Sequence, residues 1–207
     1  MKLILFGGAE IRQVKTELKQ IEKVIKYLKP KQILHIPFAR IKATEVEWTG
    51  NWFHRHIHLK GITYLNAKNK SDIKKARNPL IFISGGSNSI NLMKKIKSNP
   101  ELFKLIEKAS CIIGESAGAK ILGEYFRAKG DNDKNKMIKG LGIIKDTVIE
   151  PHYTQRKRHE LLIQDMKQTG VKYGLGIDSC TAMEFELNKF PKNIKKIGAG
   201  LVKILIK

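Results

Sequence analysis

Short apolar runs alternate with longer stretches of helical periodicity along the chain as far as Phe126. The apolar runs predict strands at Lys2–Phe6, Gln32–Ile36, Ile62–Leu65, Leu80–Ile83 and Cys111–Ile113. The stretches between them predict helices near Glu10–Leu28, Thr44–His56, Ser71–Ala76, Ser89–Lys97, Pro100–Lys108 and Ala117–Phe126. This alternation indicates a mainly parallel sheet with helices on both of its faces.

The pattern changes after Phe126. Lys129–Lys136 is polar, so we expect an exposed loop there, followed by a strand at Val148–Glu150 and a helix near Gln155–Gln168. Four further apolar segments predict an antiparallel terminal section: Tyr173–Ile177, Ala182–Leu187, Ile194–Ile197 and Gly200–Ile206. With no internal repeat and no linker, residues 1–207 are expected to form a single domain, an α/β protein built as a three-layer α/β/α sandwich.

Composition narrows the class of protein. Hydrophobic residues make up 42% of the 207 residues, enough for a core, but no run is as long as a membrane span. The first residues read as a strand and a glycine turn rather than a signal peptide. The two cysteines, Cys111 and Cys180, lie in or beside predicted core strands, which favours a reduced, cytoplasmic protein.

The net charge of +21 raises the question of a nucleic-acid partner. The excess is mostly lysine and is spread along the whole chain, with no basic tail and no stacking-aromatic motif of the RNA-binding kind. Nucleic-acid binding is therefore kept as an alternative and not as the expected main role.

The most informative stretch is Gly114–Ala119, a G-x-S-x-G pattern between an apolar run and a helix-forming run. Such a pattern places a serine on a strained turn from strand to helix, with its hydroxyl exposed as a nucleophile. The backbone N–H of Ala117 would then point at a developing oxyanion. The alternative is a buried Ser116 at an ordinary tight turn, because a bare G-x-S-x-G also occurs by chance.

A serine nucleophile needs a base, and His152 is the leading candidate because it follows a strand end. His35 falls inside a predicted strand and reads as a core residue, whereas His159 reads as solvated. His54 and His58 would share a helix face and could hold a metal, but no acidic or cysteine partner completes such a site. No metal or other cofactor is therefore expected.

A second glycine turn, Ser84–Asn88, also ends a strand and begins a helix. Its glycines would allow the backbone to approach a ligand closely, and the N–H of Gly86 could be a second oxyanion donor beside that of Ala117. The alternative is an ordinary glycine-rich turn.

Five stretches in this order resemble peptidase family S51, the serine peptidases that include dipeptidase E and cyanophycinase. They are Ile36–Ala39, Ser84–Asn88, Gly114–Ala119, Glu150–Arg158 and Gly174–Ala182. The resemblance covers nearly the whole chain and implies a class I glutamine-amidotransferase-like fold. It implies that Ser116 is the nucleophile and His152 the general base, with Gly86 and Ala117 as the oxyanion hole. Asn88, Arg156 and Arg158 are its candidates for substrate binding.

The chain departs from the family pattern at Ser179, because the family has a glutamate at this position as the third member of its triad. A serine can accept a hydrogen bond from His152 but cannot offset imidazolium charge. Asp178 or Glu150 could substitute for that acid, the site could work as a weakened dyad, or catalysis could be lost. Glu115, beside the nucleophile, is a second departure, because an acid facing the site would oppose the oxyanion.

These observations predict a serine hydrolase of the S51 type that cleaves a small, acidic (aspartyl) peptide or isopeptide through an acyl-enzyme. Arginine holds carboxylates in a bidentate geometry, which is why Arg156 and Arg158 favour an acidic substrate. Three alternatives stay open: a cyanophycinase-like exopeptidase on a β-aspartyl-arginine polymer, an impaired family member that binds an acidic peptide or metabolite, and a basic nucleic-acid-associated protein.

Overall fold

The protein is described from a computed structural model, which covers residues 1–40, 57, 59–129 and 135–207. The strands form two sheets. The larger sheet has seven strands in the order β11-β10-β1-β5-β4-β2-β3, and the smaller has five in the order β12-β9-β8-β6-β7. The α/β class and the mainly parallel sheet predicted from the sequence are confirmed, whereas the division into two sheets was not predicted.

In the larger sheet, β1, β5, β4, β2 and β3 are parallel, and β10 and β11 are antiparallel additions beyond β1. Its strands are β1 (Lys2–Phe6), β2 (Gln32–Ile36), β3 (Thr63–Asn66), β4 (Leu80–Ile83), β5 (Cys111–Glu115), β10 (Ala182–Glu186) and β11 (Lys195–Ile197). The predicted strand boundaries hold to within about two residues here. Apolar runs of this kind are what strands buried on both faces require.

The smaller sheet consists of β6 (Gly123–Lys129), β7 (Asn135–Lys139), β8 (Ile144–Pro151), β9 (Tyr173–Ile177) and β12 (Val202–Ile206). The strands β6, β8 and β9 are parallel, and β7 and β12 are antiparallel edges. One prediction is wrong here, because the helix expected at Ala117–Phe126 is one turn of helix followed by β6. Tyr173–Ile177 (β9) is antiparallel to β12, as the predicted terminal section requires, and parallel to β8 on its other side.

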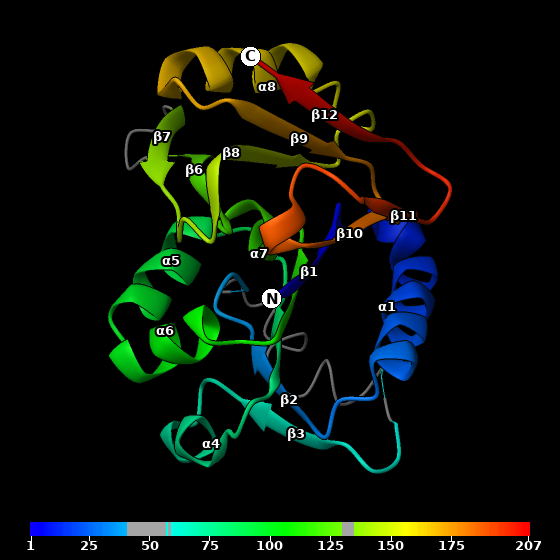
Figure 1. Cartoon of the computed structure of the whole chain (residues 1–207), viewed down its shortest axis with the longest axis vertical. Helices are drawn as coiled ribbons and strands as arrows, with labels where there is room; N and C mark the ends of the chain where they lie inside the picture. Colours follow the sequence, from blue (N-terminus) through cyan, green and yellow to red (C-terminus); the bar gives the residue numbers. More distant parts are fainter. Residues whose placement is uncertain (41–56, 58, 130–134) are drawn as a thin grey trace.

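Helices cover the larger sheet on both sides (Figure 1). On one side, α1 (Val14–Leu28) packs Ile21 and Ile25 against Ile4 and Phe6. The other face carries α4 (Lys70–Lys75), α5 (Ser89–Lys97) and α6 (Pro100–Glu107). Side chains alternate along a strand, so Leu3 and Leu5 of β1 belong to the hydrophobic cluster on this second face. The same cluster contains Ile149 of the smaller sheet.

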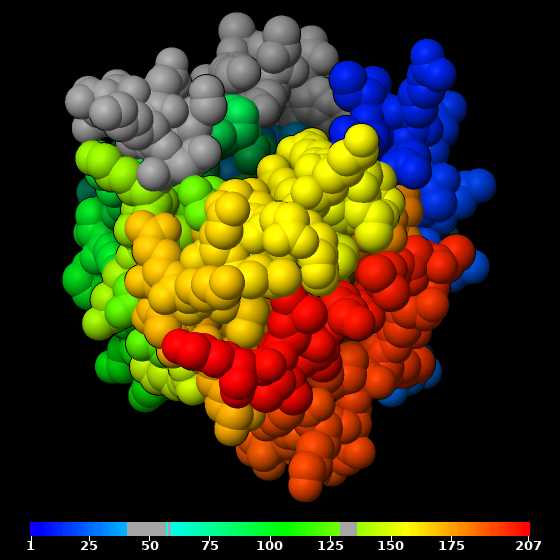
Figure 2. Space-filling view, turned by 90° about the horizontal axis from the view of Figure 1, so that it is seen from above, coloured from blue at the N-terminus to red at the C-terminus, as the bar shows by residue number. Residues whose placement is uncertain are grey.

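The smaller sheet is covered by α8 (His159–Thr169), which buries Leu162 and Met166 against Val148. The helix and the edge strand β12 form much of the face of the molecule shown in Figure 2. The remaining elements are α7 (Ala117–Lys120) and two short turns of 3-10 helix, Ile11–Gln13 and Leu187–Lys189. No helix among the described residues is both long enough and apolar enough to cross a membrane.

The carboxyl ends of β1, β5 and β8 meet where the two sheets adjoin. The loop after β1 ties them together, because Phe6 O accepts from Ser116 N at 2.9 Å and Gly7 O accepts from His152 N at 3.1 Å. Gly8 O accepts from Cys180 N at 2.8 Å. This convergence positions residues that are far apart in the sequence around one point.

Candidate active site

Ser116 lies in the sharp turn between β5 and α7, with φ 50° and ψ −108°. This backbone conformation is costly for a residue with a side chain and is kept where the surroundings enforce it. The turn after Ser116 packs tightly against the end of β4. A Cβ at Gly118 would lie 2.0 Å from the carbonyl oxygen of Ile83, so only glycine fits there. The geometry is that of a nucleophile elbow, in which the serine hydroxyl is lifted away from the backbone.

His152 follows the end of β8 and brings its Nε2 to 3.1 Å from Ser116 Oγ. The predicted contact between these two residues is confirmed. Gly8, with φ +85°, passes beside both of them: a Cβ there would lie 2.7 Å from His152 Nε2 and 2.7 Å from the Cβ of Ser116. Only glycine therefore fits the loop after β1 at this point.

The other ring nitrogen of His152 has two oxygen neighbours. Ser179 Oγ lies 2.9 Å from Nδ1, and Glu10 Oε1 lies 2.9 Å from the same atom. When Ser116 donates its hydroxyl proton to Nε2, the ring proton must be on Nδ1, where both oxygens can accept it. Ser179 was predicted at this position, but Glu10 was not.

The two acids proposed from the sequence as substitutes lie elsewhere. Asp178 accepts hydrogen bonds from the backbone N–H of Thr154 through Oδ1 and from that of Leu201 through Oδ2, each at 2.9 Å. It therefore fixes two backbone segments and does not contact the ring. This proposed substitution is wrong, because the carboxylate is already committed to those N–H groups.

Glu150 is only 1% exposed and lies between two cations, with Lys120 Nζ at 3.1 Å and Arg158 Nη1 at 2.5 Å. It therefore belongs to a buried ion cluster rather than to the histidine. Arg158 also donates to the carbonyl of Pro151 at 3.4 Å, and it does not line the cavity beside Ser116. Its predicted role in substrate binding finds no support in this geometry.

Burial, followed by the charge of Arg156, lowers the pKa of His152 from its ordinary 6.5 to about 4, although Glu10 acts in the opposite direction. The ring is therefore neutral at physiological pH, as a general base must be. Burial tends to raise the pKa of Glu10, but the hydrogen bond from Arg156 Nε at 3.1 Å and the charges of Arg156 and His152 outweigh this and lower it. Glu10 is therefore a carboxylate at neutral pH.

A cavity of about 410 Å³ opens beside the dyad. Its walls include Ser116, His152, Gly86 and Arg156, whose side chain is 46% exposed. A Cβ on Gly86 would lie 2.5 Å from the backbone of Ala39, so only glycine fits at this position of the turn. Ala117 directly follows Ser116 as the first residue of α7. Both predicted oxyanion donors thus belong to turns that flank the nucleophile.

Two acids and one arginine form another wall of this cavity: Glu17, Glu115 and Arg40. Glu115 lines the cavity, which is the arrangement that would oppose the oxyanion. Its Oε2, however, accepts a hydrogen bond from Gly85 N at 2.7 Å and lies 3.5 Å from Arg40 Nη2. Its charge thus holds the glycine turn and is partly offset. Burial raises the pKa of Glu17 well above its ordinary value, and the charge of Glu115 adds to this. Its Oε1 is buried without a hydrogen-bond partner among the described residues.

The remaining candidates have structural surroundings. Asn88 caps α5 by accepting from Asn91 N at 2.7 Å. As expected, His35 is a core residue, with its Nε2 3.0 Å from Ser84 Oγ. His159 is half-exposed and contacts Tyr153. The proposed pair His54 and His58 lies outside the described residues, and among those described no three His, Cys, Asp or Glu residues are grouped as metal ligands.

Comparison with known proteins places this chain in a family. The model of peptidase family S51 matches residues 3–192. A cyanophycinase of Synechococcus elongatus is 33% identical over 135 residues, and one of Geminocystis herdmanii is 27% identical. Each alignment covers 60% of this chain but only 41% and 48% of those relatives, so the chain spans less than half of their length.

Among solved structures, a protein of Listeria monocytogenes EGD-e named as a peptidase E has a similar fold. It superposes with a TM-score of 0.61 over 96% of this chain and 98% of its own, at 18% identity. The family match spans the elbow, the histidine and the strands that position them. This chain belongs to peptidase family S51.

Proposed function

We propose that this protein is a serine peptidase that hydrolyses a small, acidic peptide or isopeptide, with an aspartyl residue as the preferred acidic group. The observation that carries the proposal is the 3.1 Å approach of His152 Nε2 to Ser116 Oγ at a strained elbow. A serine hydroxyl becomes a nucleophile when an adjacent base can take its proton.

The reaction begins when Ser116 Oγ attacks the substrate carbonyl and its proton passes to His152 Nε2. The N–H groups of Gly86 and Ala117 are the proposed donors to the oxyanion. His152 then gives the proton to the leaving amine as the C–N bond breaks, which leaves an ester on Ser116. A water molecule, deprotonated by His152, hydrolyses this ester and restores the free serine.

Glu10 takes the position next to Nδ1 that the family's glutamate would otherwise occupy. Its carboxylate keeps the proton on Nδ1 and stabilises the imidazolium that forms in the transition state, while Ser179 is a second, neutral acceptor. We therefore infer an active site with a substitute acid rather than a bare dyad.

Arg156 is the residue proposed to select acidic substrates. It lines the cavity, is 46% exposed, and uses its Nε for Glu10, which leaves the rest of the guanidinium for a substrate carboxylate. The cyanophycinase relatives make a β-aspartyl-arginine polymer the second candidate substrate.

Residues 1–207 are proposed to form one domain, because one buried hydrophobic cluster contains residues of both sheets. A cytoplasmic location stays a prediction that rests on the two free cysteines.

The test is labelling by a fluorophosphonate followed by hydrolysis of a panel of aspartyl dipeptides and β-aspartyl-arginine. The wild type should be labelled and Ser116→Ala should not, and the panel should show which peptide is cleaved. Equal labelling of both proteins would remove Ser116 from the mechanism. If no peptide is cleaved while an acidic peptide binds, the protein is an impaired family member.

The nucleic-acid alternative makes a different prediction. Binding driven by dispersed lysines should weaken steeply as salt rises and should show no preference of sequence. Tight, sequence-selective binding at physiological salt would favour that alternative over the peptidase.

A further inference from the structure

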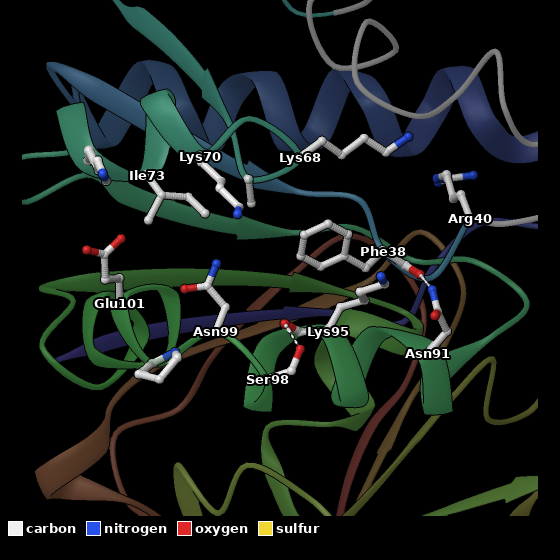
Figure 3. Close-up of a pocket in the computed structure, with 13 residues that line it drawn as sticks. Phe38, Arg40, Lys68, Lys70, Ile73, Asn91, Lys95, Ser98, Asn99 and Glu101 are labelled. Atoms are coloured by element: carbon white, nitrogen blue, oxygen red, sulfur yellow. Dashed lines mark hydrogen bonds between the residues drawn. The ribbon is translucent and has the colours of Figure 1, made fainter.

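A second and larger cavity, of about 950 Å³, lies on the same edge of the seven-stranded sheet as the active site. Phe38 and Arg40 follow β2 and enter it from one side, and Lys68 follows β3 (Figure 3). Because β3, β2, β4 and β5 are parallel neighbours, their carboxyl ends lie along one line that ends at Ser116. With about 4.8 Å between strands, β3 lies roughly 14 Å from β5.

The groove is lined mainly by cations. Its basic side chains come from the segments after β2 and β3, from both ends of α4 and from α5; they are Arg40, Lys68, Lys70, Lys74 and Lys95, against one acid, Glu101. None of the four lysines has a carboxylate within salt-bridge distance in the part of the chain that the structure describes. A concave surface lined by one sign of charge concentrates the opposite charge.

Arg40 connects this groove to the active site. It lines both cavities, and its side chain, which is 13% exposed, contacts Glu115 of the active-site cavity at 3.5 Å. In Figure 3, the side chain of Lys68 extends toward Arg40 above the ring of Phe38. The positive lining therefore continues from the groove to the wall of the cavity that holds Ser116 and His152.

We propose that this groove is an extended substrate-binding site for a run of acidic residues that lies on one side of the scissile bond. An extended peptide advances about 3.3 Å per residue, so roughly four residues cover the distance from Ser116 to the turn after β3. The preferred substrate is then an acidic oligopeptide and not only a dipeptide. The placement of the scissile bond rests on the proposed function, but binding in the groove does not.

The experiment compares binding of fluorescent di-aspartate and hexa-aspartate by Ser116→Ala, which cannot form the acyl-enzyme. Hexa-aspartate should bind at least about tenfold more tightly at low salt, because each additional carboxylate meets a lysine, and the gain should shrink as salt screens the charges. In the same background, the groove variant Lys68→Gln, Lys70→Gln, Lys74→Gln and Lys95→Gln should lose most of this gain. Its melting curve should match that of its parent, since all four side chains are exposed.

The matched control carries the same number of substitutions at exposed lysines outside both cavities: Lys167→Gln, Lys189→Gln, Lys192→Gln and Lys203→Gln. The control should keep the length-dependent gain to within about twofold. An equal loss in both variants would show that the attraction comes from the overall charge of +21 and would overturn the proposal. An oligothymidylate of equal charge that binds more tightly than hexa-aspartate would overturn it as well.

Hydrolysis by the protein with Ser116 intact separates this inference from the proposed function. If acidic peptides are cleaved but kcat/KM does not rise with their length, the groove proposal fails and the peptidase stands. If none is cleaved while the groove variant still loses the length-dependent binding, the groove stands and the peptidase proposal fails.

Discussion

Glu10 and Glu150 are both held by an arginine of the same turn, but they do different things. Arg156 contacts Glu10, which is 41% exposed and also touches the ring of His152. Arg158 contacts Glu150, which is 1% exposed and touches Lys120 as well. A carboxylate surrounded only by cations in the core contributes to the fold, whereas one at a cavity wall beside a histidine can contribute to chemistry.

The largest effect that tests this contrast is expected from Glu150→Gln. The substitution leaves Lys120 and Arg158 without their buried counter-charge, and breaking a buried pair in this way costs about 3–5 kcal/mol of unfolding free energy. Urea denaturation at neutral pH measures this loss. The protein that remains folded should keep its rate of hydrolysis to within about threefold. A loss of activity with unchanged stability would place Glu150 in the site after all.

Glu10→Gln should show the opposite pattern. Removing the carboxylate of a catalytic triad costs about 10⁴ in rate, but Glu10 is half-exposed and shares its charge with Arg156, so we expect roughly 10- to 100-fold in kcat. The unfolding free energy should change by less than about 0.5 kcal/mol. Assays of peptide hydrolysis and urea denaturation on the same preparation measure both quantities. Full activity in Glu10→Gln would leave Ser179 as the sole partner of Nδ1.

The strands that carry the site could be predicted from the sequence, but the different roles of Glu10 and Glu150 could not. Apolar runs locate β5 and β8, and small residues locate the elbow at Ser116. Glu10 was missed because its partner, His152, lies in a distant part of the chain and no motif joins them. The one available signal was its place just after Gly7 and Gly8, at the carboxyl end of a strand that neighbours β5.

The incorrect prediction of a helix at Ala117–Phe126 has a similar cause. The residues after Ala117 have good helix propensity, but Gly123 breaks the pattern, and Phe126 and Ala128 alternate with more exposed neighbours. Pairing with β7 and β8 then decides in favour of a strand. Local propensity is a weak guide where a tertiary partner is available. The two-sheet arrangement depends on such partners, and for that reason single-segment patterns did not predict it.

The pH dependence of kcat/KM separates the two contacts of Glu10. With the pKa of His152 near 4, activity should be constant near neutrality and fall with a midpoint close to pH 4 as the ring becomes protonated. Arg156→Ala removes a charge that lowers this pKa and should move the midpoint to higher pH, by roughly half a unit or more. Glu10→Gln should move it to lower pH, because the carboxylate favours the charged ring. Circular dichroism over the same pH range controls for acid unfolding. Shifts of the same sign in both variants would contradict this assignment.

The smallest effects are expected at Ser179, where the chain departs from its family. With Glu10 at 2.9 Å from Nδ1, the serine is a second acceptor, and Ser179→Ala should lower kcat by less than about threefold. Ser179→Glu should bring no gain in the wild type, since a second carboxylate would be buried beside the first and repelled by it. In a Glu10→Gln background the same substitution should recover part of the lost rate, because the ring again faces an acid. A large gain from Ser179→Glu alone would show that Glu10 does not support the histidine and that the site of this chain works as a weakened dyad.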